Sequence, residues 1–377
     1  MAQWQCPMES MVSETMEKLE FFKGKKVLVT GHTGFKGSWL SYMLTMAGAE
    51  VIGYALEPPT DPSLFQISGL EKEIISICGD IRNFAHLNKV FMEYCPELVI
   101  HLAAQPLVRE AYQNPLYTYE TNVMGTVNVC ECVRQNLCVR SFLNVTTDKV
   151  YKNHEWEWGY RENEMLDGYD PYSNSKSCSE LVTHSYRRSF YQERNVAVST
   201  ARAGNVIGGG DFAENRIIPD CIRAAQRGEP VMVRNPYSIR PYQHVLEPLY
   251  AYLKIMEKQY SDLSKAGSYN VGPEETDCIT TGELVELFCE KWGEGLTWVV
   301  KGDGGPHEAN FLKLDCSRMK KTFGWKPRWD VRIAIEKSVE WAKEYLLLKE
   351  YSPQKSICRC LERQIQEFLN GQGLEDM

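Results

Sequence analysis

Short apolar runs alternate with amphipathic segments through the first half of the chain. The apolar runs are rich in β-branched residues and predict buried strands at Lys26–Thr30, Val51–Leu56, Ile74–Cys78, Leu98–Leu102, Val139–Val145 and Ala197–Ala201. The segments between them have helical periodicity, for example Gly37–Ala47, Leu87–Tyr94 and Tyr119–Gln135. Because parallel strands need crossover helices, this alternation predicts an α/β fold with a doubly wound parallel sheet and right-handed crossovers.

The pattern loosens after about residue 205, where Gly208-Gly209-Gly210 indicates a loop. We therefore expect a nucleotide-binding domain over 24–205, to which segments near 240–270 return, and a smaller mixed α/β C-terminal substrate domain over 206–350. Within that second domain, Thr280-Thr281-Gly282-Glu283 matches a capping box and predicts a helix start. Residues 1–23 are expected to be an N-terminal extension. Residues 351–377 are expected to be a polar C-terminal tail.

The composition limits the classes of partner. The net charge of −8 and the pI near 5.6 argue against nucleic acid and anionic membranes as partners. The 13 cysteines are scattered without a CxxC pair of zinc spacing, so we expect reduced thiols, no metal site and a cytoplasmic location. The sequence contains no run of roughly 18 uncharged apolar residues, so we expect no membrane span. Residues 1–23 also lack the apolar run of a signal peptide.

A glycine-rich loop, Thr30-Gly31-His32-Thr33-Gly34-Phe35-Lys36-Gly37, follows the first predicted strand and opens a helix. Glycines at such a turn let the backbone approach a pyrophosphate closely, and the helix N-terminus supplies free N–H groups. A plain turn with three glycines is the alternative. The position of the loop after the first strand favours a Rossmann-type dinucleotide site, with Gly31, Thr33, Gly34, Phe35, Lys36 and Gly37 as cofactor-binding residues.

The adenosine end of such a cofactor has two candidate contacts. The second predicted strand runs into Tyr54-Ala55-Leu56-Glu57 without a carboxylate at its last residue, so this position leaves NAD and NADP open. Asp80, in Gly79-Asp80-Ile81 after the third strand, is placed to accept a hydrogen bond from the adenine amino group. A surface helix cap is the alternative for Asp80.

Tyr172 and Lys176 form a Tyr-x-x-x-Lys pair. Asp170-Pro171 predicts a helix start just before them, so the pair lies on one helix face at i and i+4. A tyrosine with a pKa of about 10 is a poor base, but a nearby ammonium and the positive nicotinamide favour the phenolate. We expect Tyr172 to take a proton from a sugar hydroxyl and Lys176 to hold the nicotinamide ribose. Thr147 ends the preceding strand at the edge where ligands bind, and its hydroxyl would bond the reacting oxygen.

These motifs resemble the extended short-chain dehydrogenase/reductase family and, within it, the CDP-glucose 4,6-dehydratases. The resemblance runs from about residue 20 to 345. The stretches that carry it are Gly31–Leu40 (GHTGFKGSWL), His101–Arg109 (HLAAQPLVR), Asn122–Thr126 (NVMGT), Tyr169–Lys176 (YDPYSNSK), Arg202–Asp211 (RAGNVIGGGD) and Arg240–Pro248 (RPYQHVLEP).

The resemblance implies NAD as cofactor, a CDP-hexose as substrate and a homodimer or homotetramer. Its interface would use the helices that contain Asn122 and Tyr172. It also implies that Asn122 perturbs its helix and orders a proton-relay water, which makes it a catalytic candidate. Further cofactor contacts are implied at Ile81, Leu102, Ala103, Ala104 and Gln105, with Gln105 also beside the sugar. The implied pathway is deoxysugar biosynthesis, as for lipopolysaccharide O-antigen.

A dehydratase needs more than an alcohol oxidiser. Oxidation at C4 of the glucosyl unit makes the C5 proton acidic, and an acid must then protonate the departing C6 hydroxyl. We assign Asp148 as this acid and Lys149 as the C5 base. The dTDP-linked relatives have Asp-Glu here, so Lys149 departs from them and matches the CDP-linked group. A loop salt bridge between Asp148 and Lys149 is the alternative.

Substrate contacts are also implied by the resemblance. Arg240 matches a phosphate-binding arginine, and Asn205 matches a residue at the link between pyrophosphate and sugar. Weaker candidates for nucleotide contacts are Arg202, Arg216, Asn235, His307 and Glu308, and Arg202 has the alternative role of tying the two domains together. His101 and His244 are expected to be structural.

The long aromatic loop Tyr151–Asp170 is expected to cover the sugar and exclude water, with packing at the domain junction as the alternative.

The expected activity is conversion of CDP-D-glucose to CDP-4-dehydro-6-deoxy-D-glucose and water. A nucleotide-sugar 4-epimerase shares the fold, the cofactor and the Tyr/Lys pair but has no use for Asp148 and Lys149. A dehydratase acting on another nucleotide-hexose is a further alternative. A regulatory protein that only senses NAD is disfavoured because Tyr172 and Lys176 are both present.

Overall fold

A seven-stranded parallel sheet forms the centre of the protein, with strand order β11-β6-β5-β4-β1-β2-β3. The computed structural model describes residues 17–302, 311–347 and 353–371. The strands are β1 (Lys26–Thr30), β2 (Glu50–Ala55), β3 (Ile75–Cys78), β4 (Leu98–His101), β5 (Ser141–Val145), β6 (Ala197–Ala203) and β11 (Ser268–Val271). The strand order reverses between β1 and β4, which is where parallel sheets of this kind bind ligands. The predicted doubly wound α/β fold is confirmed.

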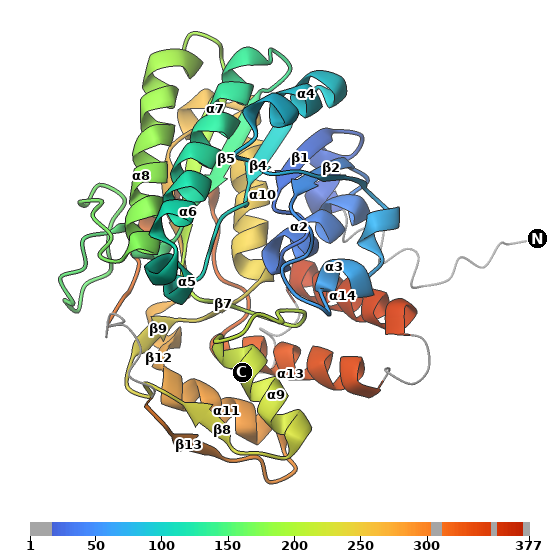
Figure 1. Ribbon diagram of the computed structural model, residues 1–377, viewed down its shortest axis with the longest axis vertical. Coiled ribbons are helices and arrows are strands. Elements are labelled where there is room, and N and C mark those ends of the chain that lie inside the picture. Colours follow the sequence, from blue (N-terminus) through green and yellow to red (C-terminus); the bar gives the residue numbers. More distant parts are fainter. Residues whose placement is uncertain (1–16, 303–310, 348–352, 372–377) are drawn as a thin grey trace, which may run out of the picture.

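Helices cover both faces of the sheet (Figure 1). Along β1, Leu28 packs into one apolar cluster, whereas Val27 and Val29 pack into the other. The helices on the Leu28 side are α4 (Phe84–Tyr94), α7 (Gly125–Gln135) and α8 (Pro171–Tyr186). On the opposite side lie α2 (Phe35–Met46) and α10 (Leu246–Ser261). Burial on both faces explains why the strands read as continuous apolar runs.

The second half of the chain builds a smaller mixed unit, at the bottom of Figure 1. Its strands pair as β8 (Val231–Val233) with β13 (Trp298–Val300), β9 (Ile239–Pro241) with β12 (Cys278–Thr280), and β7 (Val206–Ile207) with β10 (Gln243–His244). Its helices are α9 (Ile217–Arg227), α11 (Thr281–Trp292) and α13 (Val331–Leu347), whereas α12 (Ser317–Phe323) packs on α10 and on β11 of the large sheet. The predicted capping box forms at the start of α11, where the Glu283 N–H donates to Thr280 Oγ1 at 3.1 Å. Between these segments the chain returns to the large sheet through α10 and β11.

Both ends of the described chain pack against the core. A 3-10 helix η1 (Glu17–Phe22) buries Leu19 and Phe22 against the core. The segment expected to be a polar tail instead forms helix α14 (Pro353–Asn370), whose apolar face is fully buried. In the part of the chain that the structure describes, every helix is too short or too polar to cross a bilayer.

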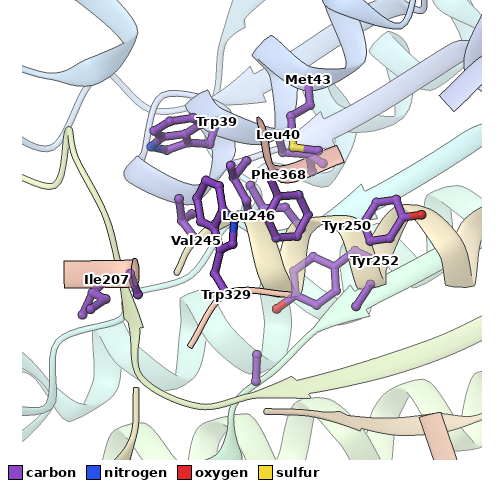
Figure 2. Packing of buried hydrophobic residues seen from close by; sticks show 14 of the residues in the cluster. Trp39, Leu40, Met43, Ile207, Val245, Leu246, Tyr250, Tyr252, Trp329 and Phe368 are labelled. Atoms are coloured by element: carbon purple, nitrogen blue, oxygen red, sulfur yellow. The ribbon is translucent and has the colours of Figure 1, made fainter. Parts of the chain in front are cut away.

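One apolar cluster joins the two halves of the molecule (Figure 2). Trp39 of α2 and Leu246 of α10 lie beside Trp329 and Phe368, which come from the chain before α13 and from α14. The rings of Trp329 and Phe368 meet edge to face, with centroids 5.2 Å apart. This shared core holds the smaller unit against the carboxyl edge of the sheet.

Candidate active site

The glycine loop between β1 and α2 has no room for side chains at two of its glycines. Gly31 has φ +78°, and a Cβ there would lie 2.8 Å from the backbone nitrogen of Ala103. A Cβ at Gly37 would lie 2.0 Å from the Gly31 carbonyl oxygen, whereas at Gly34 its nearest neighbour would be 3.5 Å away. The backbone therefore packs tightly at the start of a twelve-residue helix, whose first N–H groups have no partner within the helix. Internal packing therefore explains Gly31 and Gly37, and the free N–H groups at the start of α2 are the kind of group that binds a pyrophosphate.

The chain after β4 lies against this loop. Thr30 Oγ1 accepts hydrogen bonds from the N–H groups of Leu102 and Ala103, both at 3.2 Å, and Ala104 follows directly. On the other side, Thr33 Oγ1 donates to the Leu56 carbonyl at 2.9 Å and joins the loop to the end of β2. The predicted cofactor residues of these segments thus meet at the switch point of the sheet.

Asp80 lies at the other end of the same sheet edge, on the wall of a cavity of about 570 Å³ that also contains Arg82, Asn83, Glu120 and Met124. Its carboxylate pairs with Arg82 at 2.6 Å, and the hydrogen bond from Arg82 holds the pKa of Asp80 below its usual value. The interpretation of Asp80 as a surface helix cap is wrong, because the side chain of Asn83 caps α4.

Two other predicted positions near this cavity have different surroundings. Ile81 is buried, and a Cβ at Gly125 would lie 2.4 Å from its Cδ1, so Ile81 packs beneath the start of α7. Glu57 is exposed and lies beyond the end of β2 at Ala55.

Thr147, Asp148 and Lys149 lie directly after β5, where a short 3-10 helix η4 (Asp148–Val150) begins. Thr147 Oγ1 donates to Asp148 Oδ1 at 2.9 Å, and the Lys149 N–H donates to Thr147 Oγ1 at 3.4 Å. Tyr172 lies in the first turn of α8, which begins as predicted because Asp170 accepts from the N–H groups of Tyr172 and Ser173, each at 3.0 Å.

The direction of the Tyr172 pKa differs from the sequence expectation. Burial raises the pKa of Tyr172 to about 12, although a hydrogen bond with Thr147 works in the opposite direction. Burial, with the charge of Lys36, lowers the pKa of Lys176 to about 7. Lys176 Nζ donates to the Val145 carbonyl at 3.2 Å. In the protein without ligands, desolvation outweighs the attraction that the sequence argument assigned to the ammonium.

Asp148 is a buried carboxyl with a free oxygen. Its side chain is 2% exposed, and Oδ2 has no hydrogen-bond partner among the described residues. Burial raises the pKa of Asp148, and the charges of Lys149 and Arg240 offset part of that shift. Within the described residues Asp148 Oδ2 accepts no hydrogen bond from Lys149, and Lys149 acts on Asp148 through its charge. A carboxyl with a raised pKa suits the donation of a proton.

Asn122 lies in a π-helical turn η3 (Glu120–Met124), which interrupts the helix predicted over Tyr119–Gln135. The turn separates α6 (Pro115–Tyr119) from α7. Asn122 Nδ2 donates to the Gln105 carbonyl at 3.0 Å and to Ser175 Oγ at 2.9 Å, and its Oδ1 accepts from the Gln105 N–H at 2.8 Å. Asn122 thus joins the chain after β4 to the helix that contains Tyr172.

The Gln105 side chain is turned inward. Its Nε2 donates to Thr118 Oγ1 at 2.9 Å, and its Oε1 accepts from the Leu107 N–H at 2.6 Å. With 5% of its surface exposed, this amide supports the loop and is not presented to a ligand in this structure. This differs from the cofactor and sugar contacts that the resemblance implied.

Three predicted substrate residues border the same region. Arg240, on β9, is 4% exposed and close enough to Asp148 to affect its pKa. Arg216 precedes α9, pairs with Asp211 at 3.0 Å and acts electrostatically on both Tyr172 and Lys36. Asn205 lies between β6 and β7 and is half-buried.

The structure does not bring the remaining substrate candidates into this group. Arg202 is fully buried and paired with Glu180, which corrects its assignment as a substrate contact and supports the alternative structural role. Asn235 is exposed, and its Oδ1 accepts from the Tyr237 N–H at 3.2 Å, so it stabilises a turn. His307 and Glu308 lie outside the described residues.

The aromatic loop Tyr151–Asp170 is partly packed at the junction of the two halves, and its expected role as a cover over the sugar stays a prediction. Tyr151 and Tyr160 stack with centroids 5.2 Å apart and are buried at the junction of the two halves, as the packing alternative predicts. Trp158 and Tyr169, which are 66% and 84% exposed, project from the loop. Sequence reasoning missed the buried Glu180, although its position one helical turn after Lys176 was a usable signal.

The two histidines expected to be structural are buried. His101 hydrogen-bonds Thr30 Oγ1 at 2.7 Å and Thr126 Oγ1 at 3.2 Å. His244 packs edge to face against Trp39 and Trp329. Burial lowers the pKa of each to about 3, so both are neutral near pH 7.

Known proteins resemble this chain in sequence and in fold. The chain is similar to a CDP-glucose 4,6-dehydratase of Salmonella typhimurium, with 47% identity over 356 residues that cover 93% of this chain and 98% of that protein. Two solved structures share the fold. One is dTDP-glucose 4,6-dehydratase of Bacillus anthracis in complex with NAD (TM-score 0.71, 21% identity, 88% of this chain and 100% of that chain). The other is UDP-glucose 4-epimerase of Thermotoga maritima with UDP-glucose (TM-score 0.75, 22% identity, 85% and 99%).

A family model provides the assignment. The model described as GDP-mannose 4,6 dehydratase matches residues 28–338, which is most of the chain and includes both the glycine loop and the Tyr172–Lys176 pair. Together with the 47% identical relative, this match confirms the family that the motifs predicted. The chain belongs to the family described as GDP-mannose 4,6 dehydratase.

Proposed function

We propose that this protein is an NAD-dependent CDP-glucose 4,6-dehydratase, a hydro-lyase that converts CDP-D-glucose to CDP-4-dehydro-6-deoxy-D-glucose and water. The observation that carries the proposal is the buried Asp148, which lies beside Thr147 at the carboxyl end of β5 and has a raised pKa and an unpartnered oxygen. An enzyme that only oxidises an alcohol has no use for that carboxyl. The relative with 47% identity carries the same activity in its name.

The residues around the glycine loop fit a dinucleotide. Gly31 and Gly37 let the chain fold into a tight turn, because a side chain at either position would clash with neighbouring backbone. The N-terminus of α2, with its free N–H groups, begins at this turn. Asp80 would accept a hydrogen bond from the adenine amino group, and Lys176 would hold the nicotinamide ribose. Bound NAD would supply the acceptor for the hydride from C4 and, once reduced, the donor of that hydride to C6, which makes the overall reaction redox neutral.

Three side chains would serve the oxidation at C4. Thr147 would bond the reacting oxygen, and Tyr172 would remove its proton. Burial raises the pKa of the Tyr172 phenol to about 12, so the phenol needs positive charge beside it to ionise. The positive nicotinamide and a protonated Lys176 supply that charge when they face the phenol.

Asp148 and Lys149 would perform the elimination. Once C4 is a ketone, Lys149 removes the C5 proton, because the resulting enolate is conjugated with that ketone. Asp148 gives its proton to the C6 hydroxyl, which leaves as water. The two groups are adjacent in sequence and follow Thr147 directly, which suits action at two bonded carbons of one sugar, C5 in the ring and C6 attached to it.

Local cations support a nucleotide-diphosphate substrate in an otherwise acidic protein. The charge of Arg216 acts on Lys36 and Tyr172, and the charge of Arg240 acts on Asp148, so both arginines lie near the groups that would serve the reaction. Arginines bind phosphate oxygens with two parallel hydrogen bonds. We propose that Arg216 and Arg240 hold the pyrophosphate and that Asn205 contacts its link to the sugar.

We also propose a cytoplasmic homodimer or homotetramer that associates through the helices containing Asn122 and Tyr172. Exposed apolar side chains on these helices support this interface: Leu116 on α6 is 71% exposed, Met124 at the end of η3 53%, and Leu181 on α8 54%. Exposed apolar side chains that gather into one patch are typical of protein–protein interfaces. Light scattering of the purified protein measures the assembly.

The test of the proposed function is a substrate screen. Purified protein is incubated with CDP-, dTDP-, UDP- and GDP-glucose, and mass spectrometry follows the loss of one water. Loss of water from the CDP sugar is the expected result. Formation of CDP-galactose without loss of water would instead identify a 4-epimerase. Loss of all turnover in Tyr172→Phe separates an enzyme from a protein that only senses NAD.

A further inference from the structure

A buried polar network lies behind the candidate active site. Its centre is an ion pair between Glu180 on α8 and Arg202 on β6, both 0% exposed. Arg202 Nη2 donates to Glu180 Oε2 at 2.9 Å, and Arg202 Nε donates to Oε1 at 3.0 Å. Burial tends to raise the pKa of Glu180, but Arg202 and Thr146 more than offset it, so the carboxylate stays ionised. Burying two charges costs much of what their attraction returns, so the pair provides geometry more than stability.

The Glu180 end of the network contacts the elements that carry the proposed oxidation. Glu180 lies one turn after Lys176, with which it interacts electrostatically. Thr146 Oγ1 donates to Glu180 Oε1 at 2.5 Å, and Thr146 immediately precedes Thr147 at the end of β5. Thr200 Oγ1, on β6, donates to Glu180 Oε2 at 2.7 Å. One carboxylate thus fixes the spacing between β5, β6 and α8.

The Arg202 end of the network contacts the aromatic loop. Arg202 Nη1 donates to the Tyr151 hydroxyl at 2.8 Å and to the Glu162 carbonyl at 3.1 Å. Tyr151 in turn donates to Asn270 Oδ1 of β11 at 2.6 Å. Asn270 Nδ2 donates to the Tyr160 carbonyl at 2.7 Å. The loop is therefore anchored at several points to the same ion pair.

We propose that the Glu180–Arg202 pair positions the oxidation site: it holds Thr147, Lys176 and the anchors of the loop Tyr151–Asp170 as one rigid unit. Glu180 and Arg202 are positioning residues, since neither has exposed surface from which to touch a ligand. The role rests on the proposed function, because Thr147 and Lys176 matter here as the groups that serve hydride removal at C4.

Three substitutions test the role. Arg202→Lys keeps the charge but loses the two-pronged geometry. Thr146→Val and Tyr151→Phe each delete one hydroxyl while the ion pair remains, so they preserve the fold. We expect kcat to fall roughly 10- to 100-fold in Arg202→Lys and by about 3- to 10-fold in the hydroxyl variants, since small misplacements of reacting groups slow chemistry strongly. The KM for the nucleotide sugar should change by less than about 3-fold.

The readout specific to positioning is the isotope effect on kcat with substrate deuterated at C4. It should rise in all three variants as hydride removal becomes slower. Arg194→Lys is the matched control, because Arg194 bonds only backbone carbonyls in the described structure, at Val133 (3.3 Å) and Asn136 (3.2 Å) among others. It should keep the wild-type kcat and isotope effect.

Wild-type kcat and isotope effect in both hydroxyl variants would overturn the proposal, even if Arg202→Lys does not fold. Turnover of CDP-glucose by the wild type tests the proposed function separately. The ratio of variant to wild-type rates can be measured on any nucleotide-hexose that the wild type oxidises, so failure of one proposal is distinguishable from failure of the other.

Discussion

At the scale of single residues, the candidate site concentrates groups whose burial opposes their charge. Asp148, Lys176 and Lys36 all have pKa values shifted by burial toward the neutral form, and Tyr172 is shifted the same way. Such shifts cost folding stability and are common where proton transfer occurs. Asp148→Asn and Lys149→Ala separate the roles of the acid and the base.

Asp148→Asn should stop dehydration and stabilise the protein. The folded pKa of this carboxyl is raised above its unfolded value, so the ionised form destabilises the fold at neutral pH. The gain in melting temperature should be largest near pH 7 to 8 and disappear as the pH falls through the ordinary carboxyl range of about 4. Dehydration should fall by at least about 100-fold, while C4 oxidation, seen as reduced nicotinamide, persists. An Asn variant that dehydrates normally would remove Asp148 from the mechanism.

Lys149→Ala should abolish exchange of the C5 proton. Wild-type enzyme in deuterated water is expected to place deuterium at C5, because Lys149 removes that proton from the 4-keto sugar. Mass spectrometry of recovered sugar measures the label. The control is Lys152→Ala, an exposed lysine three residues later in the chain, which should exchange normally. Exchange at the wild-type rate in Lys149→Ala would show that another group is the base.

At the scale of elements, the glycine loop and its helix illustrate how close contact fixes a binding turn. Gly31 and Gly37 are required by the neighbouring backbone, whereas Gly34 has ordinary space around it. Substitutions at Gly37 and Gly34 therefore separate the packing of the loop from the binding of the cofactor.

Gly37→Ala should damage the loop itself, because its Cβ would lie 2.0 Å from the Gly31 carbonyl oxygen. We expect a lower melting temperature without ligands and loss of NAD binding, measured by calorimetry. Gly34→Ala is the matched variant: apart from its chain neighbours, the nearest atom of the described residues to its Cβ is the Gly31 carbonyl oxygen at 3.5 Å, so the protein should melt like wild type without ligands. Equal ligand-free stability of both variants would contradict this account of the loop.

At the scale of the whole molecule, α14 closes the structure. It packs on α13 and on α3 (Leu64–Ile67). It also contacts α2, because the hydroxyl of Tyr42 on α2 donates to Oε1 of Glu362 on α14 at 3.0 Å. Phe368 meets Trp329 and Tyr250 in the shared core. A segment outside both predicted domains thus contacts elements of each.

Ile365→Ala should destabilise the entire protein. Ile365 is 0% exposed, and removing a buried aliphatic side chain of this size costs about 2 to 4 kcal/mol. Urea unfolding followed by fluorescence should show one transition at a lower midpoint, because both halves share the core. Arg359→Ala, at an exposed position of the same helix, is the control and should be near neutral. An unchanged midpoint for Ile365→Ala would mean that α14 adds nothing to the fold.

The sequence by itself determined the parallel sheet, the glycine loop and the start of α8. These depend on local properties: strand and helix periodicity, backbone freedom at glycine, and the Asp170-Pro171 cap. Because parallel strands end at one edge, the positions of Thr147 and Asp80 along the chain also placed them at the same edge of the sheet.

Only the tertiary structure decided the rest. The pairing of Arg202 with Glu180, the inward turn of Gln105 and the raised pKa of Tyr172 all depend on burial by segments distant in the chain. The apolar face of α14 was overlooked although Ile357, Leu361 and Ile365 recur at helical spacing, and only the fold decided which elements that face packs against. Desolvation and ion pairing are set by what surrounds a group in space, and that information is absent from the order of neighbouring residues.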